Sequence, residues 1–144
     1  MTLTNLSTAA KLNALGRCDV FARIPPDTMG VLAEMMETES LGAGDLLFER
    51  GEPSDRVYVA VSGALSVFVE GRDDPVRSLG PGELLGEYGM FAGQIRTASV
   101  RADEAATLIS MDYERFRKFL HQYPEATFAL LATAVNRLVE AERT

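Results

Sequence analysis

The middle of the chain alternates short apolar runs with turn residues. In the runs 57–61 and 65–69, valine or leucine occupies every second position, and glycine, proline and aspartate separate the runs between Gly42 and Gly93. A period of two predicts strands that each carry one continuous apolar face. Several short strands with turns between them predict a small antiparallel β-barrel or jelly roll, an architecture that covers its own edges.

Apolar positions at helical spacing flank this β region. Asp27 follows two prolines and is the predicted N-cap of a helix with Met29, Leu32 and Met36 on one face. The apolar stripe of this helix is expected to pack on the barrel.

A second helical region follows the last predicted strand, residues 107–111. Asp112 is the predicted N-cap of a helix with Phe116 and Phe119 on one face, and Pro124 begins a further helix. Over residues 125–142 this final helix carries four apolar residues at helical spacing, Phe128, Leu131, Val135 and Leu138.

The pattern as a whole predicts an α+β fold that is mainly β, in a single domain of residues 1–144. Residues 1–37 form a helical N-terminal segment, residues 38–111 an antiparallel jelly roll or barrel, and residues 112–144 the C-terminal helices. A length of 144 residues, with 47% hydrophobic and 24% charged residues, is typical of one folded domain with a real core.

Arg96 has the most informative predicted position. Strand alternation turns Arg96 inward together with Ala98 and Val100, while Thr97 and Arg101 face outward. A guanidinium keeps its charge inside a protein, so an inward arginine requires an anion. Two other interpretations stay open: Arg96 pairs with a carboxylate such as that of Glu87, or the strand begins one residue later and leaves Arg96 in solvent.

The segment that precedes Arg96 favours the interpretation that Arg96 meets a bound anion. Residues 86–91 follow the turn Gly80-Pro81-Gly82 and predict one short helical turn, whose free backbone N–H groups would point at the same anion. Together these features predict a phosphate cradle.

Charge narrows the class of ligand. The formal net charge is −7 and the arginines are scattered, so the chain presents no basic face for a nucleic acid. A small anion is therefore a better candidate than a polyanion, and we expect no direct binding of nucleic acid by this chain.

The histidine and cysteine content and the N-terminal sequence exclude further classes of protein. His121 is the only histidine and Cys18 the only cysteine, which leaves no set of metal ligands and no recognisable nucleophile with its base, so we expect a binding protein without a metal, not an enzyme. Residues 1–5 lack the basic start of a signal peptide and no apolar run is long enough to cross a bilayer, which predicts a cytoplasmic protein without membrane insertion.

The motifs resemble those of the cyclic nucleotide-binding domain family over nearly the whole chain. Gly86-Glu87 and Arg96-Thr97-Ala98 are similar to the ends of its phosphate-binding cassette, here residues 86–98. Residues 41–55 resemble its opening strands and glycine turns, residues 57–68 its central hairpin, and residues 79–82 the turn before the cassette.

The resemblance implies a role for each cassette residue. Arg96 would pair with the cyclic phosphate, Glu87 would accept a hydrogen bond from the ribose 2′-hydroxyl, and backbone N–H groups around Tyr88, Gly89 and Ala98 would complete the phosphate contacts. Gly86 and Gly89 would allow the backbone to approach the ligand. Thr97 leaves cyclic GMP open as a ligand alongside cyclic AMP.

Two residues depart from the family pattern. Leu85 stands where an aromatic residue is common, and Tyr88 stands where a smaller aliphatic residue usually follows the glutamate. Tyr88 is a candidate to crowd the ribose or reshape the pocket.

Two functions follow from these observations. The first is a regulatory sensor of a cyclic nucleotide, in which the C-terminal helix closes as a lid over the purine through Leu130, Thr133, Ala134 and Arg137. The second is a jelly-roll module that binds no nucleotide and uses the apolar side of the last helix to form a homodimer or to contact an output domain.

Overall fold

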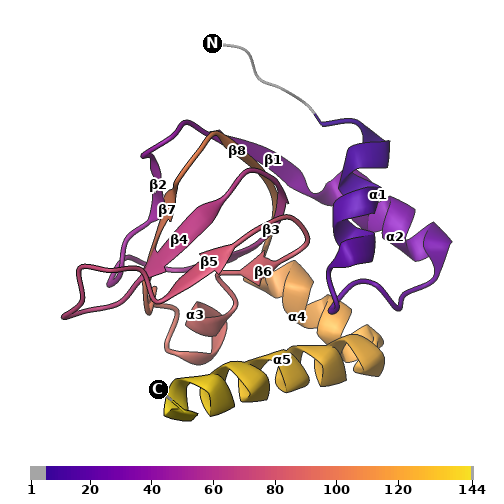
Figure 1. The fold of residues 1–144 in the computed structure, drawn as a ribbon. Coiled ribbons are helices and arrows are strands. Elements are labelled where there is room, and N and C mark those ends of the chain that lie inside the picture. Colours follow the sequence, from indigo (N-terminus) through magenta and orange to yellow (C-terminus); the bar gives the residue numbers. More distant parts are fainter. Residues whose placement is uncertain (1–5, 144) are drawn as a thin grey trace.

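The computed structural model describes residues 6–143 and contains two antiparallel sheets of four strands each, with helices at one end of the sheets and below them (Figure 1). The predicted α+β fold, mainly β with flanking helices, is confirmed. The prediction about residues 1–5 lies outside the described residues.

The two sheets divide the strands between them. The strands are β1 (Glu37–Leu41), β2 (Leu46–Phe48), β3 (Arg56–Ser62), β4 (Leu65–Phe68), β5 (Arg77–Leu79), β6 (Leu84–Leu85), β7 (Ser99–Ala102) and β8 (Ala106–Asp112). One sheet has the order β1-β8-β3-β6 and the other β2-β7-β4-β5. Every pairing is antiparallel, so the two sheets form the predicted roll.

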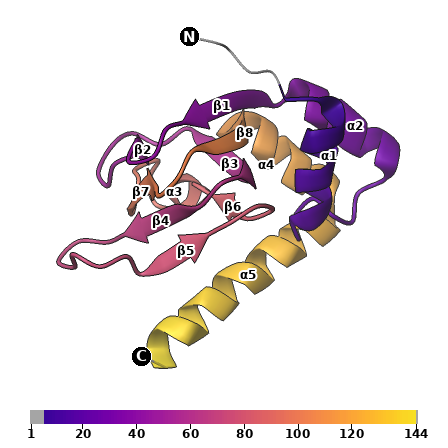
Figure 2. The ribbon, with the colours of Figure 1, turned by 45° about the horizontal axis from the view of Figure 1, so that its top comes forward.

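The helices are α1 (Thr8–Arg17), α2 (Pro26–Met35), α3 (Tyr88–Phe91), α4 (Tyr113–Gln122) and α5 (Pro124–Arg143). Figure 1 shows α1 and α2 at one end of the roll, and α5 passing below the short α3. Figure 2 shows α5 extending from the helical side past β5 and β6.

Strand β3 is buried on both faces, which the simple alternation did not indicate. Val57 and Val59 pack with α1, α2, α4 and the start of α5 in one core, whereas Tyr58 and Ala60 face the second sheet in another core with Leu65. The valine face therefore lies under the helices, and the residues between the valines close the interior of the roll.

Two predicted helix starts are confirmed and one is corrected. Asp112 caps α4, since its carboxylate accepts a hydrogen bond from the N–H of Arg115 at 2.8 Å, and Pro124 is the first residue of α5. Asp27 does not cap α2: the helix begins at Pro26, where proline needs no N–H partner, and Asp27 lies in the first turn. There a carboxylate still interacts favourably with the helix dipole.

The last helix is only partly covered by the rest of the protein. Ala126 and Leu130 are buried in the helical core. The predicted apolar stripe is exposed, with Phe128 at 68% and Leu138 at 62%. In residues 6–143, no helix combines the length and the apolar character needed to cross a bilayer.

Candidate functional site

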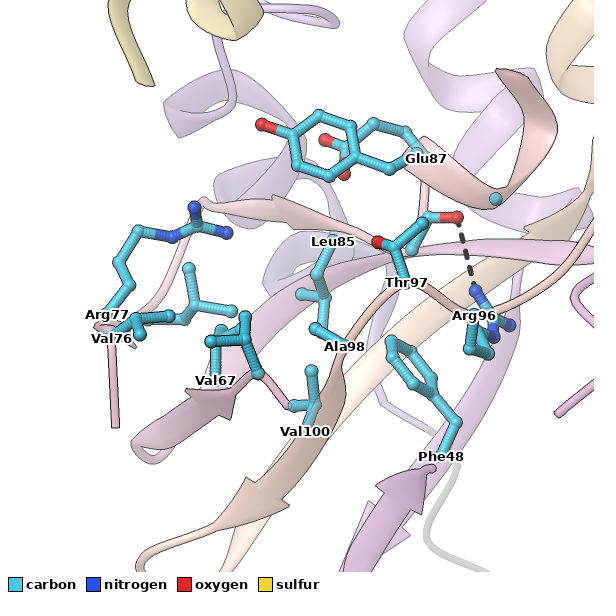
Figure 3. A pocket seen from close by; sticks show the side chains of 15 residues that line it. Phe48, Val67, Val76, Arg77, Leu85, Glu87, Arg96, Thr97, Ala98 and Val100 are labelled. Carbon is cyan, nitrogen blue, oxygen red and sulfur yellow. Dashed lines mark hydrogen bonds between the residues drawn. The ribbon is translucent and has the colours of Figure 1, made fainter. Parts of the chain in front are cut away.

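A cavity of about 320 Å³ opens between the second sheet and the segment that follows β6 (Figure 3). Most of its wall is apolar and is formed by Phe48, Val67, Val69, Val76, Leu79, Leu85, Ala98 and Val100. Four polar residues also line it, namely Arg77, Glu87, Arg96 and Thr97. A largely apolar cavity with a few charged groups is the usual form of a small-molecule site. Gly86, Tyr88 and Gly89 also line it, so the structure brings all seven predicted ligand residues of the cassette to one place.

The two glycines of the predicted cassette are required by close packing. Gly86 has a φ of 86°, and a Cβ there would lie 2.8 Å from Nη1 of Arg96. Gly89 lies in α3, where a Cβ would collide with the hydroxyl of Ser54. A larger residue at Gly89 would therefore push α3 away from Ser54 and Tyr113.

Arg96 is buried, with 4% of its surface exposed, as predicted. The reason differs from the prediction, because β7 begins only at Ser99 and Arg96 precedes it. Nη1 of Arg96 donates to the carbonyl oxygens of Gly86 (3.1 Å) and Arg56 (3.2 Å). Nε of Arg96 is buried and has no hydrogen-bond partner among residues 6–143. One side of the guanidinium is thus fixed and the Nε–H is left for another acceptor.

The backbone beside Arg96 is held by a strap, which we define as residues 51–54. The N–H of Gly51 donates to the carbonyl of Arg96, the N–H of Arg96 to the carbonyl of Glu52, and the N–H of Ser54 to the carbonyl of Gln94, each at 2.8 Å. These bonds, not a strand, turn Arg96 inward.

Two buried hydroxyl groups lie under the guanidinium. The hydroxyl of Tyr113 donates to the carbonyl of Gly86 at 2.5 Å, and it accepts from Nη1 of Arg96 at 3.4 Å. It is also hydrogen-bonded to the hydroxyl of Ser54. Burial raises the pKa of Tyr113, so the hydroxyl keeps its proton and remains a donor.

Aromatic rings cover the guanidinium of Arg96. Cζ of Arg96 lies 4.0 Å from the ring centroid of Phe48 and 5.6 Å from that of Tyr58. Such cation–π contacts stabilise a buried arginine that has no carboxylate partner. Within the part of the chain that the structure describes, Arg96 makes no ion pair, so the alternative of an Arg96–Glu87 pair is wrong.

Glu87 is the second buried charged residue of the cavity, with 2% of its surface exposed. Its Oε2 lies 3.6 Å from Nη1 of Arg137 but has no hydrogen-bond partner within the described part of the chain. Burial raises the pKa of Glu87, and the positive charges of Arg137 and Arg77 oppose that rise. A buried carboxylate oxygen without a donor is suited to a ligand hydroxyl.

Arg137 connects α5 to the cavity wall. Its Nη1 donates to the hydroxyl of Tyr88 at 3.1 Å, and its Nη2 lies 3.5 Å from the carbonyl oxygen of Leu84. The phenol of Tyr88 therefore points to α5, where it accepts a hydrogen bond, and it also lines the cavity.

The other predicted residues lie as follows. Thr97 is exposed and Ala98 half-buried, both beside the cavity. Thr133 lines a separate small pocket with Cys18 and Arg137, so its contact with a purine stays a prediction. Leu130 belongs to the helical core, whereas Ala134 lies with Arg77 and Tyr88 at a shallow pocket beside the cavity.

Several residues of the site were missed in the sequence. Phe48, Ser54 and Tyr113 approach Arg96 from distant segments, and no local pattern indicates such contacts. Arg77 could have been found, because in the run 77–79 it shares a strand face with the apolar Leu79.

The remaining candidates for chemistry lie elsewhere. His121 is exposed on α4. Cys18 is buried, and burial raises the pKa of its thiol to about 11, which keeps it protonated and unreactive. Among the described residues, no three His, Cys, Asp or Glu side chains lie close enough together to hold a metal ion.

Comparison with known proteins identifies this architecture. The sequence model of the cyclic nucleotide-binding domain matches residues 38–123, which include the cavity. A relative in Mycobacterium tuberculosis, a CRP-like cAMP-activated global transcriptional regulator, is 28% identical over 127 residues, which cover 86% of this chain and 57% of that protein. The chain thus spans little more than half the length of this relative.

Two solved structures show the same arrangement. The N-terminal domain of a transcriptional regulator from Streptomyces coelicolor superposes with a TM-score of 0.69 at 30% identity, over 91% of this chain and 96% of that domain. The catabolite activator protein of Thermus thermophilus superposes with a TM-score of 0.76 at 25% identity, over 86% of this chain and 60% of that protein.

Proposed function

The chain belongs to the cyclic nucleotide-binding domain family, and on that basis we propose that its cavity binds cyclic AMP or cyclic GMP and that α5 transmits the binding. The observation that carries this proposal is the pair of buried, incompletely satisfied groups at the cavity, Nε of Arg96 and Oε2 of Glu87. One is a donor and the other an acceptor. A cyclic phosphate beside a ribose hydroxyl supplies the complement of both.

Arg96 binds the cyclic phosphate in this proposal. Its Nη1 is already committed to two carbonyl groups, and Phe48 covers one face, so the guanidinium does not need to be ordered when the ligand arrives. Preorganisation of this kind reduces the entropy cost of binding. Backbone N–H groups of Tyr88, Gly89 and Ala98 complete the phosphate contacts.

Glu87 accepts a hydrogen bond from the ribose 2′-hydroxyl. Its Oε2 lies 3.6 Å from Nη1 of Arg137 and accepts no hydrogen bond from any residue that the structure describes. A hydroxyl that donates to this oxygen changes the strength of the ion pair between Glu87 and Arg137, and Arg137 belongs to α5. The ligand is thereby connected to the helix that follows the roll.

The terminal helix is the output element in this proposal. Arg137 is held by Tyr88 and Glu87 at the cavity, while Leu130 anchors the beginning of α5 in the helical core. The segment beyond Leu130 can therefore shift when the contacts of Arg137 change. It transmits a signal only if the ligand binds its two positions unequally.

Calorimetric titration with cyclic AMP, cyclic GMP and the corresponding linear 5′-monophosphates tests the proposal. We expect binding of at least one cyclic form and weak or no binding of the linear forms, which carry an additional negative charge and place it differently. Absence of binding by every cyclic form would refute the sensor.

A second candidate function rests on a different observation. The stripe Phe128, Leu131, Val135 and Leu138 is exposed on α5, and apolar helix faces of this kind pair with other helices. In this alternative the roll is an interaction module that forms a homodimer or contacts an output domain, and it binds no nucleotide.

The proposal also includes the compartment in which the chain acts and the ligands it does not need. We expect it to act in the cytoplasm, where cyclic nucleotides are found, without a metal or cofactor and without binding nucleic acid itself. The net charge of −7 supports the last expectation.

A further inference from the structure

Tyr113 is a buried residue that the roles proposed above leave unused, and it does not line the cavity. It is the first residue of α4, its N–H donates to the carbonyl of Asp55 at 2.8 Å, and it packs in the helical core. Elements outside the cassette of residues 86–98 therefore fix Tyr113 in place. Its hydroxyl nevertheless reaches into that cassette.

The Tyr113 hydroxyl contacts the cassette at three points. It donates to the carbonyl of Gly86 at 2.5 Å and accepts from Nη1 of Arg96 at 3.4 Å. It also lies against Gly89 of α3, since a Cβ on that residue would be only 2.7 Å from the hydroxyl oxygen. Gly86 and Arg96, which are 10 residues apart, thus share one buried contact.

The direction of these hydrogen bonds follows from the groups that make them. A carbonyl oxygen only accepts, so Tyr113 gives its single proton to Gly86, and the buried hydroxyl of Ser54 must donate to Tyr113. Nη1 of Arg96 also donates to the carbonyl of Gly86, at 3.1 Å. Two donors therefore hold this carbonyl, and they fix the orientation of the peptide that joins Gly86 to Glu87.

This arrangement sets the spacing between the two charged groups that are proposed to bind the ligand. Because Gly86 directly precedes Glu87, a Gly86 carbonyl that is fixed relative to Arg96 also fixes the ribose side of the cavity relative to the phosphate side (Figure 3). Groups held at a fixed spacing favour a rigid ligand that matches it. In a cyclic nucleotide a second ester bond locks the phosphate onto the ribose, whereas the phosphate of a linear 5′-monophosphate turns freely.

We infer that Tyr113 is a positioning residue that makes the cavity selective for a cyclic over a linear phosphate, because it holds Arg96 and the Gly86–Glu87 peptide at a fixed separation. This inference rests on the proposed function and adds to it the residue that sets the choice of phosphate. Without the hydroxyl the spacing relaxes, which costs affinity for the rigid ligand and little for the flexible one. Tyr113→Phe should lower the affinity for the cyclic form, and with it the cyclic-to-linear ratio, by roughly 2- to 12-fold, the range for one hydrogen bond.

The test is calorimetric titration of the full chain and of Tyr113→Phe with cyclic AMP and cyclic GMP. Competition of 5′-AMP and 5′-GMP against a fluorescent cyclic nucleotide gives the affinity for the linear forms. If the linear forms compete with neither protein, the affinity for the cyclic form alone decides, and it should fall by the factor given above.

Two further variants separate positioning from stability. Tyr123→Phe is the matched control, because it removes a hydroxyl at the other end of α4, where it donates to Thr28 at 3.1 Å; it should leave the affinity ratio unchanged. Ser54→Ala combined with Tyr113→Phe removes the hydroxyl that the single variant leaves unpaired. This double variant should regain stability in urea unfolding without regaining the ratio, and it carries the test if Tyr113→Phe alone does not fold.

The outcomes separate the positioning role from the proposed function. An unchanged ratio and cyclic-nucleotide affinity in Tyr113→Phe, or a ratio that returns with stability in the double variant, overturns the inference and leaves the sensor in place. An equal loss of selectivity in Tyr123→Phe also overturns it. No binding of any cyclic form by the wild type overturns the sensor, and the inference with it.

Discussion

Arg96 is the residue expected to contribute most to ligand binding at the cavity. Its guanidinium is buried, its Nη1 is satisfied by carbonyl groups and its Nε is not. We expect Arg96→Ala to weaken binding of the cyclic nucleotide by about 2–5 kcal/mol, because it removes a charge-assisted contact from a buried site. Isothermal titration of both proteins measures the loss.

Arg101→Ala is the control for this prediction. Arg101 is exposed and lies over Phe68, with Cζ 4.7 Å from the ring centroid, away from the cavity. The same loss of charge should therefore leave affinity nearly unchanged. Equal effects of the two variants would show that Arg96 acts only through the overall charge of the protein.

Tyr113 is expected to contribute to stability through its hydroxyl. Tyr113→Phe leaves the buried hydroxyl of Ser54 without its partner, which should cost about 1–3 kcal/mol in urea unfolding. Ser54→Ala in the Tyr113→Phe background removes that unsatisfied group. The double variant should thus be less destabilised than the sum of the two single variants, and simple additivity would contradict the contact.

Glu87 gives stability a dependence on pH. Burial raises its pKa in the folded protein above the usual value of 4.5, so the folded state takes up a proton more readily than the unfolded state. Wild type should therefore gain stability relative to Glu87→Gln as the pH falls from neutral through the raised pKa toward about 4.5, and lose it as the pH rises. Urea unfolding at several pH values gives this difference. A difference that grows toward neutral pH would mean that the Arg137 contact outweighs burial.

At the residue scale the sequence indicated which side chains matter but not their partners. Alternation placed Arg96 inside, although the strap produces that burial and the strand does not. Glu87 meets Arg137 across 50 residues, and Phe48 and Tyr113 reach Arg96 from other elements. Contacts of this kind depend on how the elements pack, and no local pattern encodes that packing.

At the scale of elements, α5 is the part expected to respond to ligand. Beyond Leu130 it is held to the cavity through Arg137, which contacts Tyr88 and Glu87. We expect amide hydrogen exchange over residues 131–139 to change on addition of the ligand, while exchange in β3 and β8 at the centre of their sheet stays the same. Unchanged protection in α5 would exclude it as the output element.

The element boundaries show which signals are strong. Proline at the first helical position and aspartate at an N-cap located α5 and α4, because both act through local backbone chemistry. The same reasoning misplaced the start of α2 by two residues, because it put the N-cap at Asp27 and the N-cap is Pro25. The two-sided burial of β3 was also missed, since Tyr58 and Ala60 become buried only when the second sheet covers them.

At the scale of the whole molecule, the apolar stripe of α5 is exposed to solvent where a monomer would be expected to bury it. If this stripe pairs with a second copy, light scattering should show a dimer that dissociates on dilution, and Leu131→Glu should shift it to the monomer. Asn136→Glu, also exposed on α5 but outside the stripe, should not. A monomer at high concentration would count against self-association.

The strap has a consequence for how the molecule can be altered. It fixes the chain at Arg96, and close packing fixes it at Gly89, yet the residues at Phe91, Ala92 and Gly93 between these points are exposed. Exposed loops between anchored ends tolerate added chain. We therefore expect a fluorescent domain inserted between Ala92 and Gly93 to lie in the loop that joins the two cavity-lining segments 86–89 and 96–98, and to leave their charged groups in place, which makes this turn a natural place to build an optical reporter.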